Sequence, residues 1–405
     1  MIDQRLLKVM FVDDEVRILQ GLQRMLRPLR DTWDMQFFES GEAALQAMAA
    51  APVDIVVSDM RMPSMSGAEL LTRVMRQFPS TMRIILSGQA DMELVHQTIG
   101  PTHQYLSKPC DTETLKTTVN RAEKLRRLLG NDRLRLLVGR MDSLPSLPAL
   151  YLQLVELLQD PNATLLQVGE LVAQDLGMSI KLLQLVNSAF FGLRRNVSNP
   201  IDAVNLLGVE TIQSLVLSVH AFHQLNAEQM AEFSLESIWQ HSMAVAGLAK
   251  RIALAEGLNK IQGEEAHMAG MLHDVGRVVL ATNIPEDYAK VLTMAKTQGR
   301  PHAACEMEML GATHTEVGAY LLGLWGIADP IVEAVAYHHA PRECPNRVFG
   351  TLSAVHVADA LHHDMTESLG CGSIDSAYLD DLGLRDHLPA WTKLMDSGKG
   401  AANGG

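Results

Sequence analysis

Three aspartates, a serine and a lysine are the first residues whose types and spacing could do chemistry together. Asp13, Asp14, Asp59 and Ser87 each come at the end of a short apolar run, and Lys108 follows a fifth run. If the runs are parallel strands, their ends meet at one edge of the sheet and these side chains converge. Crowded carboxylates repel one another unless a cation neutralises them, and an all-oxygen site suits Mg²⁺. Asp59 is therefore expected to act as a nucleophile or a metal ligand, unless these are simply the acidic loop ends of an ordinary flavodoxin-like domain. Phosphoryl transfer to Asp59 would need the cation and a positive group on the phosphoryl oxygens, which Lys108 supplies, and the hydroxyl of Ser87 can donate a hydrogen bond.

The elements that must position these residues alternate along the first part of the chain. Short apolar runs occupy Lys8–Val12, Met35–Phe38, Val53–Ser58, Arg83–Ser87 and His103–Leu106, and amphipathic stretches lie near 15–29, 41–50, 66–78, 91–99 and 111–127. Strand patterns alternating with helix patterns indicate a doubly wound α/β domain of the flavodoxin-like type, with a five-stranded parallel sheet covered on both faces.

A second set of residues suited to chemistry consists of histidines and aspartates on mostly apolar helical stretches. The candidates are His241, His273, Asp274, His314, His338, His339 and Asp359. Burying so many titratable groups is costly unless they share a partner, and a metal ion is the simplest shared partner. Imidazole and carboxylate ligands suit Fe, Mn, Zn or Ni. Thr313 and Glu316 have the spacing of a capping box, which predicts a helix that begins at His314.

The rest of the chain is expected to be helical. Strand patterns cease after Ser107, and residues 111–140 predict one long or slightly broken helix, interrupted near Gly130. The basic second half of this helix indicates a solvated connector, or a segment that pairs with a second copy of the chain. Prolines mark a boundary at 141–148, and the pattern from 149 to about 364 is helical throughout, with a break near Asn226–Phe233.

These patterns predict four segments along the chain. They are a sheet domain at 6–125, a helical linker at 126–141, an all-α domain at 142–364 and a C-terminal extension at 365–405. The all-α domain is expected to consist of a first part at 142–228 and a second part at 233–364. The extension ends in a stretch rich in Gly, Ala and Asn, Ser397–Gly405, which predicts a disordered tail.

Composition narrows the class of protein. A chain of 405 residues with 47% hydrophobic and 20% charged residues has the size and composition of two or three globular domains. Its net charge of −13 argues against general affinity for nucleic acid or anionic membranes, and no apolar run is long enough to span a bilayer. The four cysteines are far apart and the N-terminus lacks the order of a signal peptide, which together predict a reducing, cytoplasmic setting.

Residues 6–125 resemble the receiver domains of response regulators. The resemblance rests on Val12-Asp13-Asp14-Glu15, Ser58-Asp59-Met60-Arg61-Met62-Pro63, Leu86-Ser87-Gly88 and Tyr105-Leu106-Ser107-Lys108-Pro109. It implies that Asp59 is the phosphoacceptor and that a sensor histidine kinase is the partner. It also implies that Asp13, Asp14, Asp59 and the backbone carbonyl of Arg61 bind Mg²⁺, and that Ser87 and Tyr105 form a switch pair.

Residues 142–364 resemble the HDOD branch of the HD superfamily. The most distinctive segments are Asn187-Ser188-Ala189 and Leu272-His273-Asp274-Val275-Gly276. In HD phosphohydrolases the His-Asp doublet and flanking histidines hold metal, and metal-bound water attacks phosphate. The resemblance implies that the ligands here are His241, His273, Asp274, His338, His339 and Asp359, with His314 as a further candidate for a second metal.

At two places the sequence departs from the pattern of active HD-type enzymes, and both bear on what the HDOD-like half does. The sequence Ala340-Pro341-Arg342-Glu343 follows the double histidine, where active phosphodiesterases of the HD-GYP branch carry Gly-Tyr-Pro, and Arg277 replaces the usual lysine. We therefore predict a two-component response regulator with a non-enzymatic HDOD output that binds a protein or a nucleotide. The alternative is a phosphorylation-gated, metal-dependent phosphohydrolase acting on a nucleotide or cyclic dinucleotide. A DNA-reading output is not expected, because the region after residue 140 is neither basic nor short.

Overall fold

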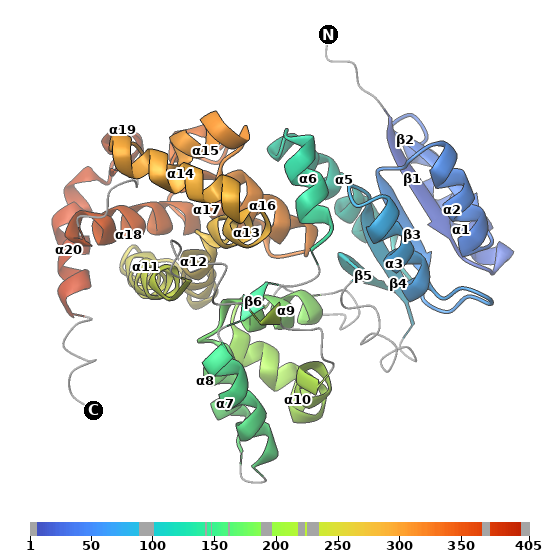
Figure 1. The fold of residues 1–405 in the computed structure, drawn as a ribbon, viewed down its shortest axis with the longest axis horizontal. Coiled ribbons are helices and arrows are strands. Elements are labelled where there is room, and N and C mark those ends of the chain that lie inside the picture. The colour runs from blue at the N-terminus through green and yellow to red at the C-terminus, as the bar shows by residue number, and fades with distance from the viewer. Residues whose placement is uncertain are drawn as a thin grey trace. The chain divides into compact units, whose positions relative to one another are not determined.

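The computed structural model describes residues 6–88, 101–141, 144–146, 148–160, 163–187, 197–217, 223–224, 235–366 and 373–397. The chain divides into two compact units, one comprising Met1–Leu225 with Gly323–Ile327 and the other Asn226–Leu322 with Ala328–Gly405 (Figure 1). The four predicted segments and their boundaries stay a prediction. The predicted break at Asn226–Phe233 and the predicted tail after Ser397 lie outside the described residues.

A five-stranded parallel sheet forms the centre of the N-terminal domain. Its strands are β1 (Leu7–Val12), β2 (Trp33–Phe38), β3 (Ile55–Asp59), β4 (Met82–Ser87) and β5 (Gln104–Ser107). They are ordered β2-β1-β3-β4-β5 and every neighbouring pair is parallel, which is the flavodoxin-like order. Val9, Phe11, Val57 and Ile84 are almost completely buried, as strands covered on both faces require. The predicted fold class is confirmed.

Helices follow the strands at the predicted places. They are α1 (Val16–Leu26) with the short 3₁₀ helix η1 (Arg27–Leu29), α2 (Gly41–Ala50), α3 (Gly67–Gln77) and α5 (Thr112–Leu128). Side chains of Ser40, Ser66 and Asp111 accept hydrogen bonds from backbone N–H groups at the starts of α2, α3 and α5, which fixes where these helices begin. The helix predicted near 91–99 lies outside the described residues.

The predicted interruption near Gly130 is confirmed. Helix α5 ends at Leu128, and α6 (Asp132–Gly139) begins after Asn131, whose side chain accepts a hydrogen bond from Leu134 N at 3.2 Å. Helix α6 is tied to the sheet by Arg83 of β4, a fully buried side chain. Its guanidinium donates to Gly139 O at 2.9 Å and to Pro101 O at 2.5 Å. Arg83 therefore satisfies backbone carbonyls that burial would otherwise leave without donors.

The remainder of the first unit is helical apart from one short pairing. Its helices are α7 (Pro148–Gln159), α8 (Leu165–Val172), α9 (Leu176–Val186) and α10 (Pro200–Leu217). Two-residue strands β6 (Pro145–Ser146) and β7 (His223–Gln224) pair in parallel. The prediction that strands cease after Ser107 is therefore wrong. A two-residue strand is too short to show an alternation of apolar and polar residues, so the pattern could not reveal it.

The second unit is all helical among its described residues. Its helices are α11 (Leu235–Ala255), α12 (Lys260–Leu272), α13 (Val275–Asn283), α14 (Pro285–Gln298), α15 (His302–Leu310), α16 (His314–Leu324), α17 (Asp329–Tyr337), α18 (Thr351–Thr366), α19 (Ser376–Leu382) and α20 (Leu388–Ser397), with short 3₁₀ helices η5 (Pro341–Glu343) and η6 (Arg385–His387). Helices α11, α12, α17 and α18 pack against one another. None of the described helices has the length and apolar character needed to cross a membrane.

The predicted capping box of α16 is confirmed. Thr313 N donates to Glu316 Oε2 at 2.7 Å, and Glu316 N donates to Thr313 Oγ1 at 3.3 Å. These reciprocal bonds satisfy N–H groups that the first turn leaves without partners, and they place His314 in that turn.

Candidate phosphoacceptor site and candidate metal centre

The ends of β1 and β3 bring two carboxylates and one ammonium together. Lys108 Nζ donates to Asp13 Oδ2 at 2.7 Å and also forms an ion pair with Asp59 Oδ1. Backbone N–H groups hold the other carboxylate oxygens: Glu15 N donates to Asp13 Oδ1, and Arg61 N donates to Asp59 Oδ2, both at 2.9 Å. The convergence expected from parallel strand ends is therefore present for these three charged side chains.

Three further predicted residues lie on or next to strands β1, β4 and β5. Asp14 is half-buried beside Asp13, and Tyr105 is buried on β5 in register with Ile85 of β4. Ser87, at the end of β4, is 1% exposed, and its hydroxyl has no hydrogen-bond partner among the described residues. A buried hydroxyl without a partner costs free energy, so Ser87 is suited to donate to an incoming oxyanion.

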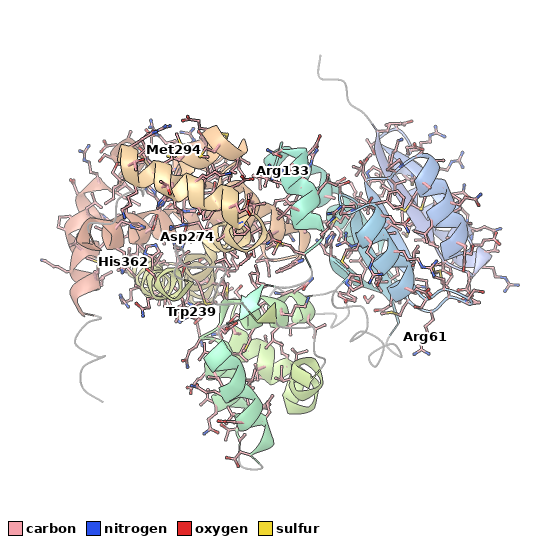
Figure 2. The ribbon with its side chains drawn as sticks, in the orientation of Figure 1. Arg61, Arg133, Trp239, Asp274, Met294 and His362 are labelled. Atoms are coloured by element: carbon pink, nitrogen blue, oxygen red, sulfur yellow. The ribbon has the colours of Figure 1, made fainter. Side chains whose placement is uncertain are left out.

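Arg61 and Gly67 define the loop that follows Asp59. The side chain of Arg61 is exposed and points away from the sheet (Figure 2), so any ligand from this residue would be its backbone carbonyl. Gly67 starts α3, where its N–H donates to Met60 O at 3.0 Å. A Cβ atom at Gly67 would overlap the carbonyl oxygen of Asp59, so only glycine lets the helix approach this closely.

Burial and charge act in opposite directions at the strand ends. Burial raises the pKa of Asp59, and Lys108 only partly offsets this. Burial would lower the pKa of Lys108, but its hydrogen bonds to Asp13 and Asp59 outweigh burial and raise that pKa. Lys108 therefore stays positive, and a divalent cation would relieve the crowding of the carboxylates. Oxygen donors of this kind fit Mg²⁺.

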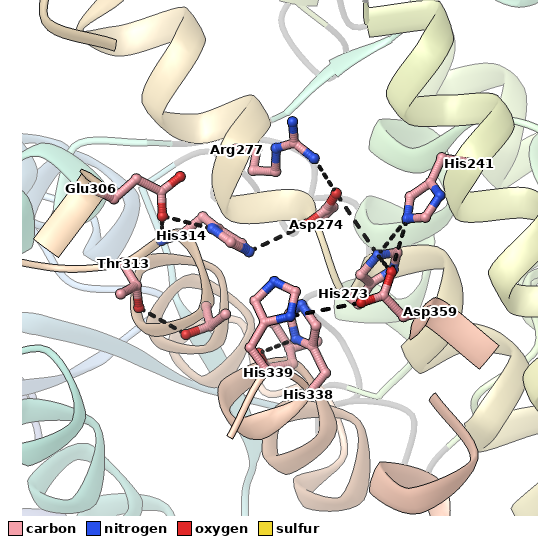
Figure 3. A network of polar contacts seen from close by, with 12 residues as sticks. His241, His273, Asp274, Arg277, Glu306, Thr313, His314, His338, His339 and Asp359 are labelled. Atoms are coloured by element: carbon pink, nitrogen blue, oxygen red, sulfur yellow. Dashed lines mark hydrogen bonds and ion pairs between the residues drawn. The ribbon is translucent and has the colours of Figure 1, made fainter. Parts of the chain in front are cut away.

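In the second unit, seven predicted side chains gather from five places in the helical fold (Figure 3). His241 lies in α11, His273 and Asp274 join α12 to α13, His314 begins α16, His338 and His339 follow α17, and Asp359 lies in α18. Their ligand atoms form two groups in which all atoms lie within 4.8 Å of one another. The first group is Asp274, His314, His338 and His339, and the second is His241, His273 and Asp359.

His314 is oriented by a buried carboxylate. Glu306 of α15, which is completely buried, accepts hydrogen bonds from His314 Nδ1 at 2.6 Å and from His314 N at 2.7 Å. Tyr288 Oη donates to the other oxygen of Glu306 at 3.1 Å. Because Nδ1 carries the proton toward Glu306, His314 Nε2 keeps its lone pair and lies 3.4 Å from Asp274 Oδ1. A carboxylate behind an imidazole is the usual way of orienting a metal-ligating histidine.

Two other imidazoles are anchored by backbone carbonyls. His273 Nδ1 donates to Gly270 O at 2.7 Å, and His338 Nδ1 donates to Val335 O at 3.0 Å. The Nε2 atoms of His314 and His338 are buried without a hydrogen-bond partner among the described residues. Two buried nitrogen lone pairs without donors are costly, and a metal ion would satisfy both. The residues present therefore fit a metal ion.

The second group is packed around one carboxylate oxygen. His241 Nε2 lies 3.1 Å from Asp359 Oδ1 and 3.1 Å from His273 Nε2, while His273 Nε2 lies 3.6 Å from the same oxygen. Asp274 connects the groups: its Oδ1 faces His314, and its Oδ2 accepts from Arg277 at 2.7 Å and lies 3.8 Å from His273 Nε2. Asp274 is thus the residue that can serve both groups.

Gly276 permits the approach of two helices that carry the centre. A Cβ atom at this position of α13 would overlap the carbonyl oxygen of His314 in α16. Only glycine therefore lets the segment after His273 and Asp274 pack directly on the start of α16. This packing is what brings Asp274 and His314 within reach of one another.

Two family models match separate parts of the chain. A family model of the response regulator receiver domain matches residues 9–120, and a model of the HDOD domain matches residues 144–341. The chain is a receiver domain followed by an HDOD domain.

Individual relatives cover parts of this arrangement. An uncharacterized protein of Treponema pallidum is 26% identical over 223 residues, 55% of this chain and 43% of its own length. The hydrogenase transcriptional regulatory protein HoxA of Cupriavidus necator is 31% identical over 125 residues, 30% of this chain and 25% of its own length. The chain thus spans less than half the length of these curated relatives. The crystal structure of the MmoQ response regulator of Methylococcus capsulatus matches with 26% identity and a TM-score of 0.48, over 62% of this chain and 98% of that one.

Most protonation states in the HDOD domain suit metal binding. Burial, reinforced by neighbouring imidazoles, lowers the pKa of His338 well below its usual range and that of His339 to about 4. Burial would raise the pKa values of Asp274 and Asp359, but both are lowered: Arg277 and neighbouring histidines outweigh burial at Asp274, and hydrogen bonds from histidines outweigh it at Asp359. Neutral imidazoles and ionised carboxylates are the forms that bind a metal ion. His273 is the exception: burial would lower its pKa, but Asp274 and Asp359 outweigh burial and raise it to about 9, so His273 would release a proton when metal binds.

Sequence reasoning missed three side chains that the HDOD domain places beside the predicted ones. His362 and His363 follow Asp359 by three and four residues on α18, a spacing that puts them on one helix face with it and could have revealed them. Glu306 precedes His314 by eight residues on a different helix. No local spacing rule connects Glu306 to His314, so only the fold could identify it.

Proposed function

We propose that the protein is a two-component response regulator whose receiver accepts a phosphoryl group on Asp59 from a sensor histidine kinase in the cytoplasm. The observation that carries the proposal is the contact of Lys108 with both Asp13 and Asp59 at the carboxyl ends of the strands. A nucleophilic carboxylate, a neighbouring acid for the metal and a fixed positive charge are the parts that phosphoryl transfer to an aspartate needs.

The other residues of the receiver would have supporting roles. Asp13, Asp14, Asp59 and the carbonyl of Arg61 would hold Mg²⁺, which when bound neutralises charge on the phosphoryl oxygens. Lys108 and the unpartnered hydroxyl of Ser87 would then donate to those oxygens. Ser87 and Tyr105, on the neighbouring strands β4 and β5, are the proposed switch pair.

The direct test is phosphorylation by a small-molecule donor. Purified protein incubated with acetyl phosphate and Mg²⁺ is expected to gain one phosphoryl group, seen by intact-mass spectrometry and placed by peptide mapping in the segment that contains Asp59. Chelation of Mg²⁺ should prevent the gain, because the carboxylates then repel the phosphate. Labelling that persists in chelator, or that maps to another segment, contradicts the proposal.

For the output we propose a non-enzymatic HDOD module that holds metal and binds a protein or a nucleotide. The Arg277 guanidinium, which stands where HD phosphohydrolases carry a lysine, is held by Asp274 at 2.7 Å. A guanidinium paired in this way stabilises the fold of the metal centre and does not bind the phosphate of a substrate. The acidic chain favours a protein, a second copy of itself or a nucleotide over DNA or a membrane as the partner.

A second candidate, a metal-dependent phosphohydrolase gated by phosphorylation, is favoured by one observation. All seven predicted ligands come together in the two groups, which is the donor set that a hydrolytic metal centre would use. The test is to purify the protein without chelator, measure bound metal, and assay hydrolysis of cyclic dinucleotides and model phosphodiesters with and without beryllofluoride as phosphoryl mimic. We expect bound metal and no turnover. Metal-dependent turnover would establish the second candidate, and protein without metal would contradict both proposals for the centre.

A further inference from the structure

Residues 373–397, the described part of the C-terminal extension, lie beyond the residues that the HDOD family model matches, yet they pack into the second unit. Tyr378 of α19 and Trp391 of α20 are each 1% exposed. Tyr378 Oη shares a hydrogen bond of 2.7 Å with Ser353 Oγ of α18, and Trp391 Nε1 donates to Glu256 Oε1 at 2.8 Å. The extension therefore contacts one of the helices that carry the metal centre.

His356 of α18 links this extension to the metal centre. Asp375 N, directly before α19, donates to His356 Nε2 at 3.0 Å, and His356 Nδ1 lies 2.7 Å from His338 O. A backbone N–H can only donate, so Nε2 accepts and the ring proton is on Nδ1, which donates to His338 O. Both ring nitrogens are bonded within the protein, so this buried histidine is not itself a metal ligand.

The carbonyl that accepts this bond belongs to the peptide between two candidate ligands. His338 and His339 directly follow α17, and the last carbonyls of a helix have no N–H partner within it. The bond from His356 supplies that partner and fixes the plane of the peptide. Because this peptide sets the directions in which both side chains leave the backbone, it sets where the two imidazoles of the first group can reach.

Asp375 also holds the chain just after the double histidine. Its Oδ2 atom accepts from Arg342 Nε at 2.8 Å, and its Oδ1 atom accepts from Tyr378 N at 3.0 Å, which caps α19. Arg342 lies in η5, which follows the double histidine. One residue of the extension thus bonds on both sides of this turn, through His356 to the peptide before His339 and through Arg342 to the segment after it.

We propose that His356 is a positioning residue of the metal centre, through which the C-terminal extension holds the ligands His338 and His339 in place. The proposal rests on the proposed metal centre and extends it. Without the bond to His338 O, the turn that carries both imidazoles is freer to move, and ordering it again when metal binds costs conformational entropy. Loss of the bond is therefore expected to weaken metal binding at the first group while the protein stays folded.

Two substitutions of His356 separate its two hydrogen bonds. The amide of asparagine places an N–H donor near the position of Nδ1, and the amide of glutamine places an oxygen acceptor near the position of Nε2. His356→Asn therefore keeps the donor to His338 O, whereas His356→Gln keeps only an acceptor for Asp375 N.

The measurement is a Co²⁺ titration of the chelator-stripped full-length protein, followed by the visible absorption of the bound ion. His356→Gln should weaken Co²⁺ binding about 10-fold, the lower range for changes outside the ligand shell, because it acts through a backbone carbonyl. His356→Asn should bind Co²⁺ as the wild type does. The control His387→Gln removes a bond of the extension to Glu256, away from the double histidine, and should also match the wild type.

The substitution Asp375→Pro tests the part of the extension. Proline has no N–H, and the φ of −75° at this position is one that proline adopts. Without the N–H, nothing holds the ring proton of His356 on Nδ1. The matched control Asp375→Ala loses the same side-chain bonds to Arg342 and Tyr378 but keeps the N–H. Asp375→Pro should therefore lower Co²⁺ affinity more than Asp375→Ala does.

The outcomes separate this inference from the proposal on which it rests. If the wild type binds no Co²⁺, the proposed metal centre fails and the inference fails with it. If the wild type binds Co²⁺ and His356→Gln matches its affinity and spectrum, His356 is not a positioning residue, while the metal centre stands. Equal losses in His356→Asn and His356→Gln would mean that the side chain only fills space, which also overturns the inference. Near-ultraviolet circular dichroism of the metal-free variants reports the fold. If His356→Gln is unfolded, Asp375→Pro decides, and an affinity equal to that of Asp375→Ala contradicts the inference.

Discussion

Asparagine in place of Asp59 is expected to abolish phosphorylation by acetyl phosphate while leaving the receiver folded. The amide is not a nucleophile toward phosphorus, and no other carboxylate at the strand ends is bonded as Asp59 is, to Lys108 and to the N–H of Arg61. Stability should change little, because burial already disfavours the ionised form of Asp59 and Lys108 keeps Asp13 as a partner at 2.7 Å. Intact-mass spectrometry measures the phosphorylation, and thermal unfolding measures the stability.

Asp54→Asn is the matched control for this substitution. Asp54 directly precedes β3, at the opposite end from Asp59, and its Oδ2 accepts a hydrogen bond from Lys8 N at 2.9 Å. The same chemical change at this position should leave labelling at the wild-type level. Labelling of Asp59→Asn to the wild-type extent would refute the assignment of the phosphoacceptor, and loss of labelling in Asp54→Asn would show that the assay reports folding rather than chemistry.

The strands and site residues of the receiver could be predicted closely because the sequence patterns that identify them are local. Each strand is an apolar run, each site residue stands at the end of a run, and parallel pairing then forces Asp13, Asp59 and Lys108 together without knowledge of the packing. The sequence could not show that Ser87 Oγ would be buried without a partner, because that depends on the side chains that surround it.

In the HDOD half, the sequence could single out the candidate ligands that the fold brings together, but not the residues that support them. His273 and Asp274 are adjacent, and the other candidates lie near helix ends or on an apolar helix, so residue type alone singled them out. Glu306 and Tyr288 reach His314 from other helices, and the pairing of β6 with β7 joins residues 145–146 to 223–224. Such contacts are set by tertiary packing, which overrides any local pattern.

Alanine in place of Asp274 is expected to release metal from both groups and to destabilise the metal-free protein. Asp274 Oδ1 faces His314 in the first group, and Oδ2 faces His273 in the second, so its loss should lower metal affinity by more than about 100-fold. It also leaves Arg277, only 13% exposed, without its carboxylate. Removing one partner of a buried ion pair costs about 3–5 kcal/mol. Metal analysis and urea unfolding in chelator measure the two effects separately.

Asp287→Ala is the control for an ion pair of the same spacing. Asp287 and Lys290 are three residues apart, as Asp274 and Arg277 are, but on the exposed surface of α14. Loss of that pair should cost less than about 1 kcal/mol and no metal. Retention of both metal equivalents by Asp274→Ala would contradict the assignment of Asp274 as the residue shared by the two groups.

The double variant Asp274→Ala with Arg277→Met separates the two roles of the aspartate. An apolar side chain of similar length at position 277 removes the charge that Asp274 offsets in the wild type, and replacing a buried ion pair by apolar residues is often neutral. The free energy of unfolding in chelator should therefore recover most of the loss, while metal binding should stay weak because the ligand is still absent. If metal binding recovered together with stability, the effect of Asp274 on metal would come from the fold alone. If neither recovered, Arg277 would not be the group that Asp274 neutralises.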